Sequence, residues 1–166
     1  MTDTRDAWVV YDSVHGNTRT IAEAVAEGLR AEGPVHLVAA SDADGDLLRE
    51  ARTVVLGCPT HAFSLSPAMK AFTARLTPGS LAGVPVAVFD TRFEVGEMPA
   101  WILRLVVRAI GRRAWAATGL RRIAARAGAT DLAEPVGFIV RDTEGPLADG
   151  EVERARAWGR SLASTA

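Results

Sequence analysis

The sequence predicts an α/β fold in which helices cover both faces of one five-stranded parallel sheet, a doubly wound arrangement. Short runs that are apolar throughout alternate along the chain with longer segments of helical periodicity, and such runs are typical of strands buried on both faces. The chain has 166 residues, of which 48% are hydrophobic, which suits one globular domain. No internal repeat, low-complexity stretch or long linker divides it, so we expect residues 1–166 to form a single domain.

Five apolar runs are the expected strands, and the third is especially rich in β-branched residues. A short extended piece near Leu132 precedes the last of them. The runs are residues 8–11, 35–38, 53–57, 84–89 and 136–140.

Helical segments lie between these runs. The first places Ile21, Val25 and Leu29 on one face and stops before a Gly-Pro pair. Another begins at Ser66-Pro67, with serine as the N-cap and proline at the first helical position. The expected helices are residues 17–31, 44–50 (a short and weak one), 66–76, 99–113, 116–127 and 150–163.

Composition excludes several classes of protein. The 19 Lys and Arg residues nearly balance 20 Asp and Glu residues, which argues against a nucleic-acid-binding protein. The single cysteine, Cys58, excludes an intrachain disulfide; we interpret it as a small apolar core residue and assign no metal site. Residues 1–6 lack the apolar stretch of a signal peptide, and no run of apolar residues is long enough to span a bilayer. We therefore expect a cytoplasmic protein.

A loop suited to binding phosphate follows the first strand and leads directly into a helix. Backbone N–H groups and the positive end of the helix dipole favour an anion there, and a glycine lets the backbone close around it. Serine, threonine and asparagine side chains add neutral donors. The pattern differs from the glycine-rich dinucleotide and nucleotide loops. Ser13, Gly16, Asn17 and Thr18 are the candidates for holding the phosphate. The candidate binding residues of the whole loop are Ser13, Val14, His15, Gly16, Asn17 and Thr18.

Two further loops follow the third and fourth strands, and ligands of doubly wound folds bind at these carboxyl ends. The second loop consists of Pro59, Thr60, His61, Ala62 and Phe63. The third consists of Asp90, Thr91, Arg92 and Phe93.

These loops resemble the motifs of the flavodoxin family. Ser13, Gly16, Asn17 and Thr18 match its phosphate signature, whereas His15 stands where the family has threonine or serine. The segment 57–72 is similar to the family's ring-binding loop and the helix that follows it. Asp-Thr-Arg at 90–92 and the segment 142–147 resemble a bacterial flavodoxin-like subgroup. The resemblance spans about residues 1–90 and 116–163.

The resemblance implies that FMN is the cofactor. It implies that the first loop holds the phosphate, and that the second and third loops flank the flavin ring. His61 or Phe63 would take the place of the usual aromatic residue in the second loop, and Phe93 is the available aromatic in the third, where no tyrosine stands.

The implied function is electron transfer, and we favour an electron carrier with no catalytic acid or base. Two alternatives stay open: an FMN-dependent oxidoreductase acting on a quinone or another small substrate, and a non-redox binding module that kept the fold. The expected partner is a redox protein or a small-molecule acceptor, with no nucleic acid, and the chain is a monomer or a homodimer.

An arginine-rich insertion at about residues 98–115 departs from the resemblance. Residues 98–130 carry seven arginines and no acidic residue, whereas the rest of the chain is acidic. Apolar side chains cover most of the circumference of the helix expected there, which predicts burial on most sides. Three interpretations remain: a helix packed on the sheet, a lid or dimer face beside a cofactor, or a surface for an anionic partner, a membrane or a quinone-like substrate. Membrane contact is the less favoured of these because interfacial helices usually have a wider polar face.

Overall fold

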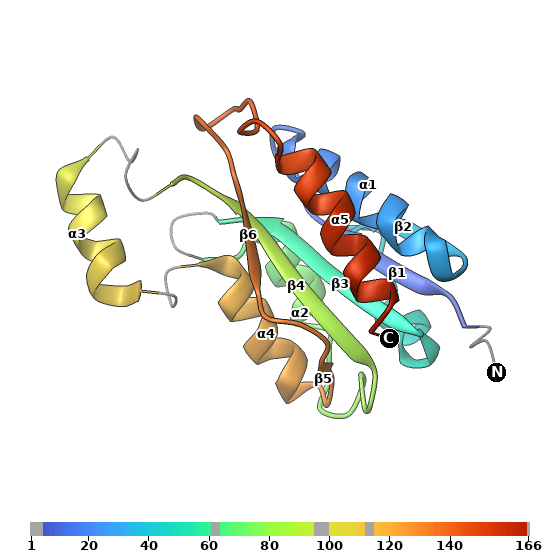
Figure 1. Cartoon of the computed structure of the whole chain (residues 1–166). Coiled ribbons are helices and arrows are strands. Elements are labelled where there is room, and N and C mark those ends of the chain that lie inside the picture. The colour runs from blue at the N-terminus through green and yellow to red at the C-terminus, as the bar shows by residue number, and fades with distance from the viewer. Residues whose placement is uncertain (1–4, 61–63, 95–99, 112–114, 166) are drawn as a thin grey trace.

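A parallel sheet lies at the centre of the computed structural model, which describes residues 5–60, 64–94, 100–111 and 115–165 (Figure 1). The strand order is β2-β1-β3-β4, and β5 and β6 share the far edge of β4. β5 pairs with the beginning of β4 and β6 with its end, all in parallel. The strands are β1 (Ala7–Tyr11), β2 (Val35–Ala39), β3 (Thr53–Pro59), β4 (Pro85–Arg92), β5 (Thr130–Asp131) and β6 (Val136–Ile139).

The predicted doubly wound parallel fold is confirmed. The fifth strand position, beside β4, is occupied by two short strands. The predicted last strand is β6, and the extended piece expected near Leu132 is β5 at residues 130–131. Each part covers a different portion of β4, so the two together occupy one edge of the sheet.

Helices cover both faces of the sheet (Figure 1). Residues of α1 and α5 pack on one face, whereas residues of α2, α4 and η2 pack on the other. Three expected helices differ in detail. The first ends at Leu29 and continues as the 3-10 turn η1, the weak helix is the 3-10 helix η2, and the helix expected over 66–76 ends at Thr73. The elements are α1 (Asn17–Leu29), η1 (Arg30–Glu32), η2 (Gly45–Glu50), α2 (Pro67–Thr73), α3 (Trp101–Ile110), α4 (Ala116–Arg126) and α5 (Glu151–Ala163).

The two-residue period of the strands divides the core into two clusters. Val9 and Phe89 belong to the cluster beneath α1 and α5, whereas Val10 and Val88 belong to the cluster beneath α2 and α4. These side chains are at most 2% exposed, so every central strand is buried on both faces. That burial is why the strands read as uninterrupted apolar runs.

Helices α1 and α5 approach each other closely enough for their backbones to touch. A methyl group on Gly28 would lie 2.3 Å from the carbonyl oxygen of Arg156, and one on Gly159 would lie 2.3 Å from that of Val25. Backbone atoms cannot move aside as a flexible side chain does, so these two positions require glycine.

The thiol of Cys58 lies in β3 with no exposed surface. Burial raises the pKa of Cys58 from its usual 9.0 to about 12, because the charged thiolate would lose its hydration there. The side chain is therefore a neutral core group, as expected from the sequence.

The arginine-rich segment corrects one expectation. α3 is not buried on most sides and does not pack on the sheet; it stands apart from both helical layers (Figure 1). Trp101, Ile102 and Leu105 are exposed, while Leu103 and Val107 make its contacts with Phe93 and Trp115. The apolar circumference that predicted burial instead leaves a hydrophobic surface in the open.

We predict that Gly159→Ala lowers the free energy of unfolding by about 2 kcal/mol, as over-packing typically does. The loss should occur although alanine favours helices over glycine. Gly119→Ala in α4 is the matched control, because its methyl group would meet only the flexible Leu65 Cδ1, at 2.9 Å. Urea unfolding measures both; equal stabilities of the two variants would contradict the backbone contact.

We also predict an alkaline destabilisation that depends on Cys58. The unfolded thiol ionises above about pH 9 while the folded thiol stays protonated, so stability falls as pH rises toward the folded pKa of about 12. Between about pH 8 and about pH 10 the free energy of unfolding should fall by about 1.4 kcal/mol more for the wild type than for Cys58→Ala. Parallel pH profiles would show that the thiol is not buried in this way.

Candidate functional site

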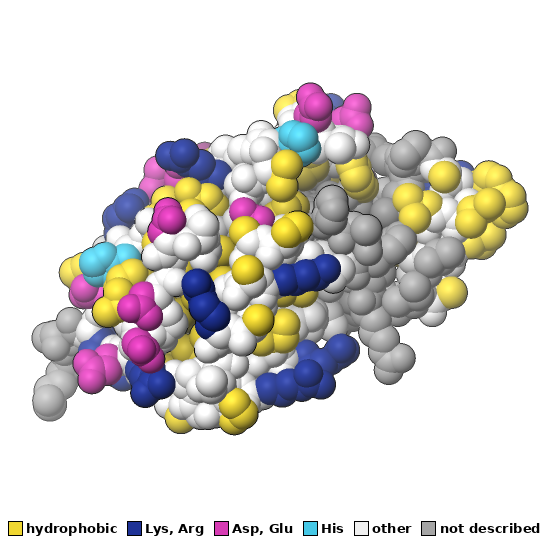
Figure 2. All heavy atoms as spheres, turned by 180° about the vertical axis from the view of Figure 1, so that it is seen from behind, with side chains coloured by type: hydrophobic (Ala, Val, Ile, Leu, Met, Phe, Trp, Pro, Cys, Tyr) yellow, Lys and Arg dark blue, Asp and Glu magenta, His cyan; other side chains and the backbone are white. Residues whose placement is uncertain are grey.

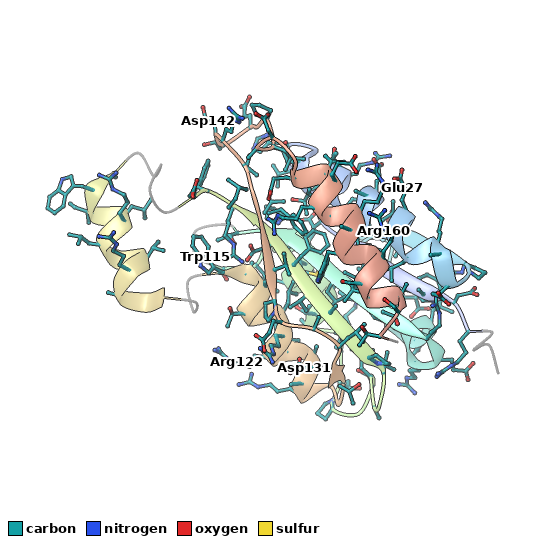
Figure 3. All side chains as sticks on the ribbon, viewed as in Figure 1. Glu27, Trp115, Arg122, Asp131, Asp142 and Arg160 are labelled. Atoms are coloured by element: carbon teal, nitrogen blue, oxygen red, sulfur yellow. The ribbon has the colours of Figure 1, made fainter. Side chains whose placement is uncertain are left out.

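A pocket of about 210 Å³ opens at the carboxyl ends of β1, β3 and β4. Its wall combines hydroxyl and amide side chains with aromatic and aliphatic ones. Figure 3 shows two contributors from distant parts of the chain, Trp115 at the beginning of α4 and Asp142 in the loop after β6. The lining residues are Val14, His15, Asn17, Thr18, Pro59, Thr60, Thr91, Arg92, Phe93, Leu103, Trp115, Val140, Asp142 and Thr143.

The first loop is held in shape by Ser13 and Gly16. Gly16 is the residue before α1 and has a φ of 89°, a left-handed conformation that favours glycine. The hydroxyl of Ser13 accepts hydrogen bonds from the backbone N–H groups of Gly16 (3.1 Å) and Arg19 (3.2 Å). The backbone N–H groups of Asn17 and Thr18 belong to the first turn of α1, where no intrahelical acceptor exists. The loop therefore presents donors at the positive end of a helix.

Two hydrogen bonds join this loop to other parts of the pocket. The hydroxyl oxygens of Thr18 and Thr91 lie 2.8 Å apart, which ties the beginning of α1 to the end of β4. The amide nitrogen Nδ2 of Asn17 donates to the backbone carbonyl of Glu144 at 3.1 Å. These contacts hold the loops after β1, β4 and β6 around one space.

A buried carboxylate organises the opposite wall. Asp90 is completely buried and accepts hydrogen bonds from Arg92 Nε (2.5 Å), the backbone N–H of Ala117 (2.8 Å) and the Thr60 hydroxyl (3.1 Å). Burial raises the pKa of Asp90, while the Arg92 cation and the donated hydrogen bonds offset part of that rise. The carboxylate thus joins β3, β4 and the first turn of α4.

Arg92 is confined on several sides. Its guanidinium carbon lies 4.4 Å from the centre of the Trp115 ring, in a cation–π contact. A methyl group on Gly137 would lie only 2.2 Å from Arg92 Nε, so the side chain packs directly on the backbone of β6. Asp90 on one side and Trp115 on the other therefore hold one cation at the wall of the pocket.

The structure brings most of the predicted loop residues together. Ser13 and Gly16 shape the first loop without lining the pocket, and Asp90 lies behind the wall and supports it. Residues 61–63, which include the predicted His61, Ala62 and Phe63, lie outside the described residues. The predicted residues that line the pocket are Val14, His15, Asn17, Thr18, Pro59, Thr60, Thr91, Arg92 and Phe93.

Five further lining residues were not among the predicted site residues. Asp142 and Thr143 lie in the segment 142–147, whose family resemblance was the available signal. Leu103 and Trp115 belong to the arginine-rich segment and its end, where no motif marks them. Val140 follows β6 and has only its apolar character to indicate a role.

Ionisable side chains of the described residues do not form a metal site. No group of three or more histidine, cysteine, aspartate and glutamate side chains in this part of the chain is arranged to hold an ion.

We predict that Asp90→Ala lowers the free energy of unfolding by about 3–5 kcal/mol, the usual effect of removing one partner of a buried ion pair. The variant leaves the donors of Arg92, Ala117 and Thr60 without their acceptor. Asp149→Ala is the control, because the Asp149 side chain is 95% exposed and its ion pair with Arg141 lies at the surface. Thermal and urea unfolding compare the two variants. A similarly small loss of stability in both would show that the fold does not depend on the Asp90 carboxylate.

Comparisons with solved structures support the fold. Flavodoxin 2 of Bacillus cereus matches with a TM-score of 0.75 and 22% identity, over 96% of this chain and 98% of that one. The flavodoxin of Streptococcus pneumoniae TIGR4 matches with a TM-score of 0.72 and 21% identity, over 97% and 99%. The flavodiiron protein of Giardia intestinalis matches with a TM-score of 0.69 and 19% identity; nearly all of this chain (99%) aligns with 36% of that one.

A comparison of the sequence with curated individual proteins finds no significant match, whereas a comparison with family models does identify a family. The model of the family described as flavodoxin matches residues 9–91, which is half of the chain and includes the first loop, the end of β3 and most of β4. With the parallel sheet and the pocket at the ends of those strands, this match shows that the chain belongs to the flavodoxin family.

Proposed function

We propose that this protein binds FMN in the pocket at the carboxyl ends of the strands and carries electrons between redox partners. Homologues in the flavodoxin family bind FMN. The observation that carries the proposal for this chain is the composition of the pocket wall, which offers neutral hydrogen-bond donors together with aromatic and aliphatic surface. FMN has a phosphate, a hydroxylated chain and a flat ring, and so requires both kinds of wall.

The first loop fits the phosphate of FMN. Backbone N–H groups in the first turn of α1 lie at the positive end of the helix dipole. In the Thr18–Thr91 pair one hydroxyl donates to the other, and the accepting hydroxyl keeps a proton that it can donate to an anion. A dianionic phosphate is thus met by several neutral donors, and the loop needs no cation for it.

The rest of the wall fits the ring. Phe93, Leu103, Trp115 and Val140 supply apolar surface that excludes water from a flat aromatic group. Arg92 supplies a fixed positive charge at this wall. When bound, FMN supplies the reversible uptake of electrons; the chain holds it and sets the electrostatic environment. Arg92 lines the pocket while the Asp90 carboxylate that neutralises it lies behind the wall, so the ring meets the positive end of an ion pair. That end stabilises added negative charge on the ring, but less than an unpaired cation would.

An electron carrier is the form of this function that we favour over a substrate-specific oxidoreductase. The described pocket residues include no group that we assign as a catalytic acid or base, and electron transfer needs none.

The proposal is tested by titrating the purified chain with FMN and following flavin absorbance and fluorescence. We expect one FMN per chain, a yellow protein and release of FMN on denaturation. Failure to bind FMN would contradict the proposal. Steady reduction of a quinone at the expense of NADPH by the FMN-loaded chain, with no other redox protein present, would assign it to the oxidoreductase alternative.

The same titration of two threonine variants tests the placement of the phosphate. Thr18→Val removes a buried hydroxyl from the pocket and should weaken FMN binding about tenfold or more, the worth of one hydrogen bond to a charged group. Thr20→Val is the matched control, because Thr20 is exposed on α1 and its hydroxyl donates only to the carbonyl of Gly16. Riboflavin, which lacks the phosphate, should distinguish the two variants much less. Equal losses for both variants would place the phosphate elsewhere.

A further inference from the structure

The outward side of α3 is an exposed apolar surface. Trp101, Ile102 and Leu105 are 65%, 57% and 53% exposed, and we call these three residues the outer face of α3. The opposite side of the helix makes its contacts with the body through Leu103 and Val107. Figure 2 shows the resulting concentration of hydrophobic side chains on the part of the molecule that protrudes farthest. A helix of ten residues thus has one packed side and one apolar side without a described partner.

Positive charge borders this outer face. Arg104 and Arg108 are exposed on α3. At about 100° per residue, Arg108 lies about 20° and Arg104 about 60° around the helix from Trp101, on the side away from Leu105. The sequence from residue 98 to residue 130 carries no acidic side chain. The charge of any partner is therefore constrained: it must be negative or neutral where it meets the arginines.

The narrow polar face made membrane contact the less favoured expectation, but in the structure part of the apolar circumference packs on the body and only the outer face is left open. From the charge that borders it, we propose that the outer face of α3 docks the protein on an anionic lipid surface. Tryptophan prefers the boundary between water and acyl chains, leucine and isoleucine enter the apolar layer, and arginine reaches the headgroups. A second copy of the chain is a poorer occupant, because it would bring the same arginines against these. None of the described helices is long and apolar enough to cross a bilayer. With ten residues α3 is about 15 Å long, about half the thickness of the apolar layer, so the proposal places it parallel to the membrane surface.

Docking in this way also orients the pocket. Leu103 of α3 lines the pocket, and Val107 belongs to the same small cluster as Phe93 and Trp115, which line it too. A lipid surface that holds α3 therefore lies beside the proposed flavin site. If the proposed function holds, a redox partner at the membrane is reached without a separate docking domain, whereas lipid binding itself does not require FMN.

The experiment is co-sedimentation of the full chain, with and without added FMN, on vesicles of phosphatidylcholine alone or with one quarter phosphatidylglycerol. We expect binding to the anionic vesicles that weakens at high salt and a blue shift of tryptophan emission that Trp101→Phe reduces. The double variant Trp101→Ser/Leu105→Ser should lower the partition coefficient about tenfold or more. Arg108→Glu should lower it about fivefold or more.

Two matched controls separate α3 from general surface effects. Leu47→Ser removes a leucine that is 54% exposed on η2, and Arg30→Glu reverses an exposed charge after α1. Both should bind as the wild type does, and urea unfolding checks that all variants are folded.

No binding to anionic vesicles, equal binding to neutral vesicles, or equal losses in the controls would overturn the proposal. So would self-association in sedimentation velocity that requires Trp101, or α3-dependent binding to an acidic helical peptide without binding to vesicles. Because vesicle binding is measured without FMN as well, its failure is distinct from failure of the proposed redox function.

Discussion

The carboxylate of Asp90 is the interaction on which the architecture of the pocket depends. It has no access to solvent, so its three donors must compensate for its lost hydration. Those donors come from the residue that follows β3, the end of β4 and the first turn of α4. Arg92, held by this carboxylate, in turn lies against Trp115 and the backbone at Gly137. One buried carboxylate thus fixes the positions of β3, β4, β6 and α4 relative to one another around the site.

The acidic and basic parts of the sequence lie in different parts of the structure. The acidic background belongs to the parts of the chain that carry most of the sheet and its covering helices, while residues 98–130 carry seven arginines. In the structure this basic stretch includes α3, which stands apart from the helical layers; its described contacts with the pocket wall are those of Leu103 and Val107. The insertion at about residues 98–115, which departs from the family motifs, thus contains the exposed helix α3, whereas α4 in the same basic stretch packs on the sheet.

Most of the fold could be predicted from the sequence because central parallel strands are buried on both faces and so appear as apolar runs. The boundaries were harder where the local pattern allows two helical forms, as at residues 30–32 and 45–50. The residues of α3 were misjudged for a physical reason. An apolar circumference indicates that burial of the helix would be favourable, but periodicity does not show whether the fold supplies a surface that covers it.

For the site as well, the sequence predicts the residues that belong to local motifs but not those placed by contacts between distant segments. Loop residues with local signatures, such as Thr18 and Thr91, do line the pocket, whereas the roles of Trp115 and Leu103 arise from contacts between segments distant in sequence. Asp90 and Thr91 were grouped as cofactor-binding residues, yet adjacent strand residues point to opposite faces. Thr91 accordingly meets Thr18 beside α1, while Asp90 turns toward α4.

The most direct test of the account is a crystal structure of the chain grown with FMN. We expect the phosphate against residues 13–18 and the ring beside Phe93 and Trp115, with Arg92 still bonded to Asp90. FMN bound away from the carboxyl ends of the strands, or a crystal without FMN from a solution saturated with it, would contradict the account.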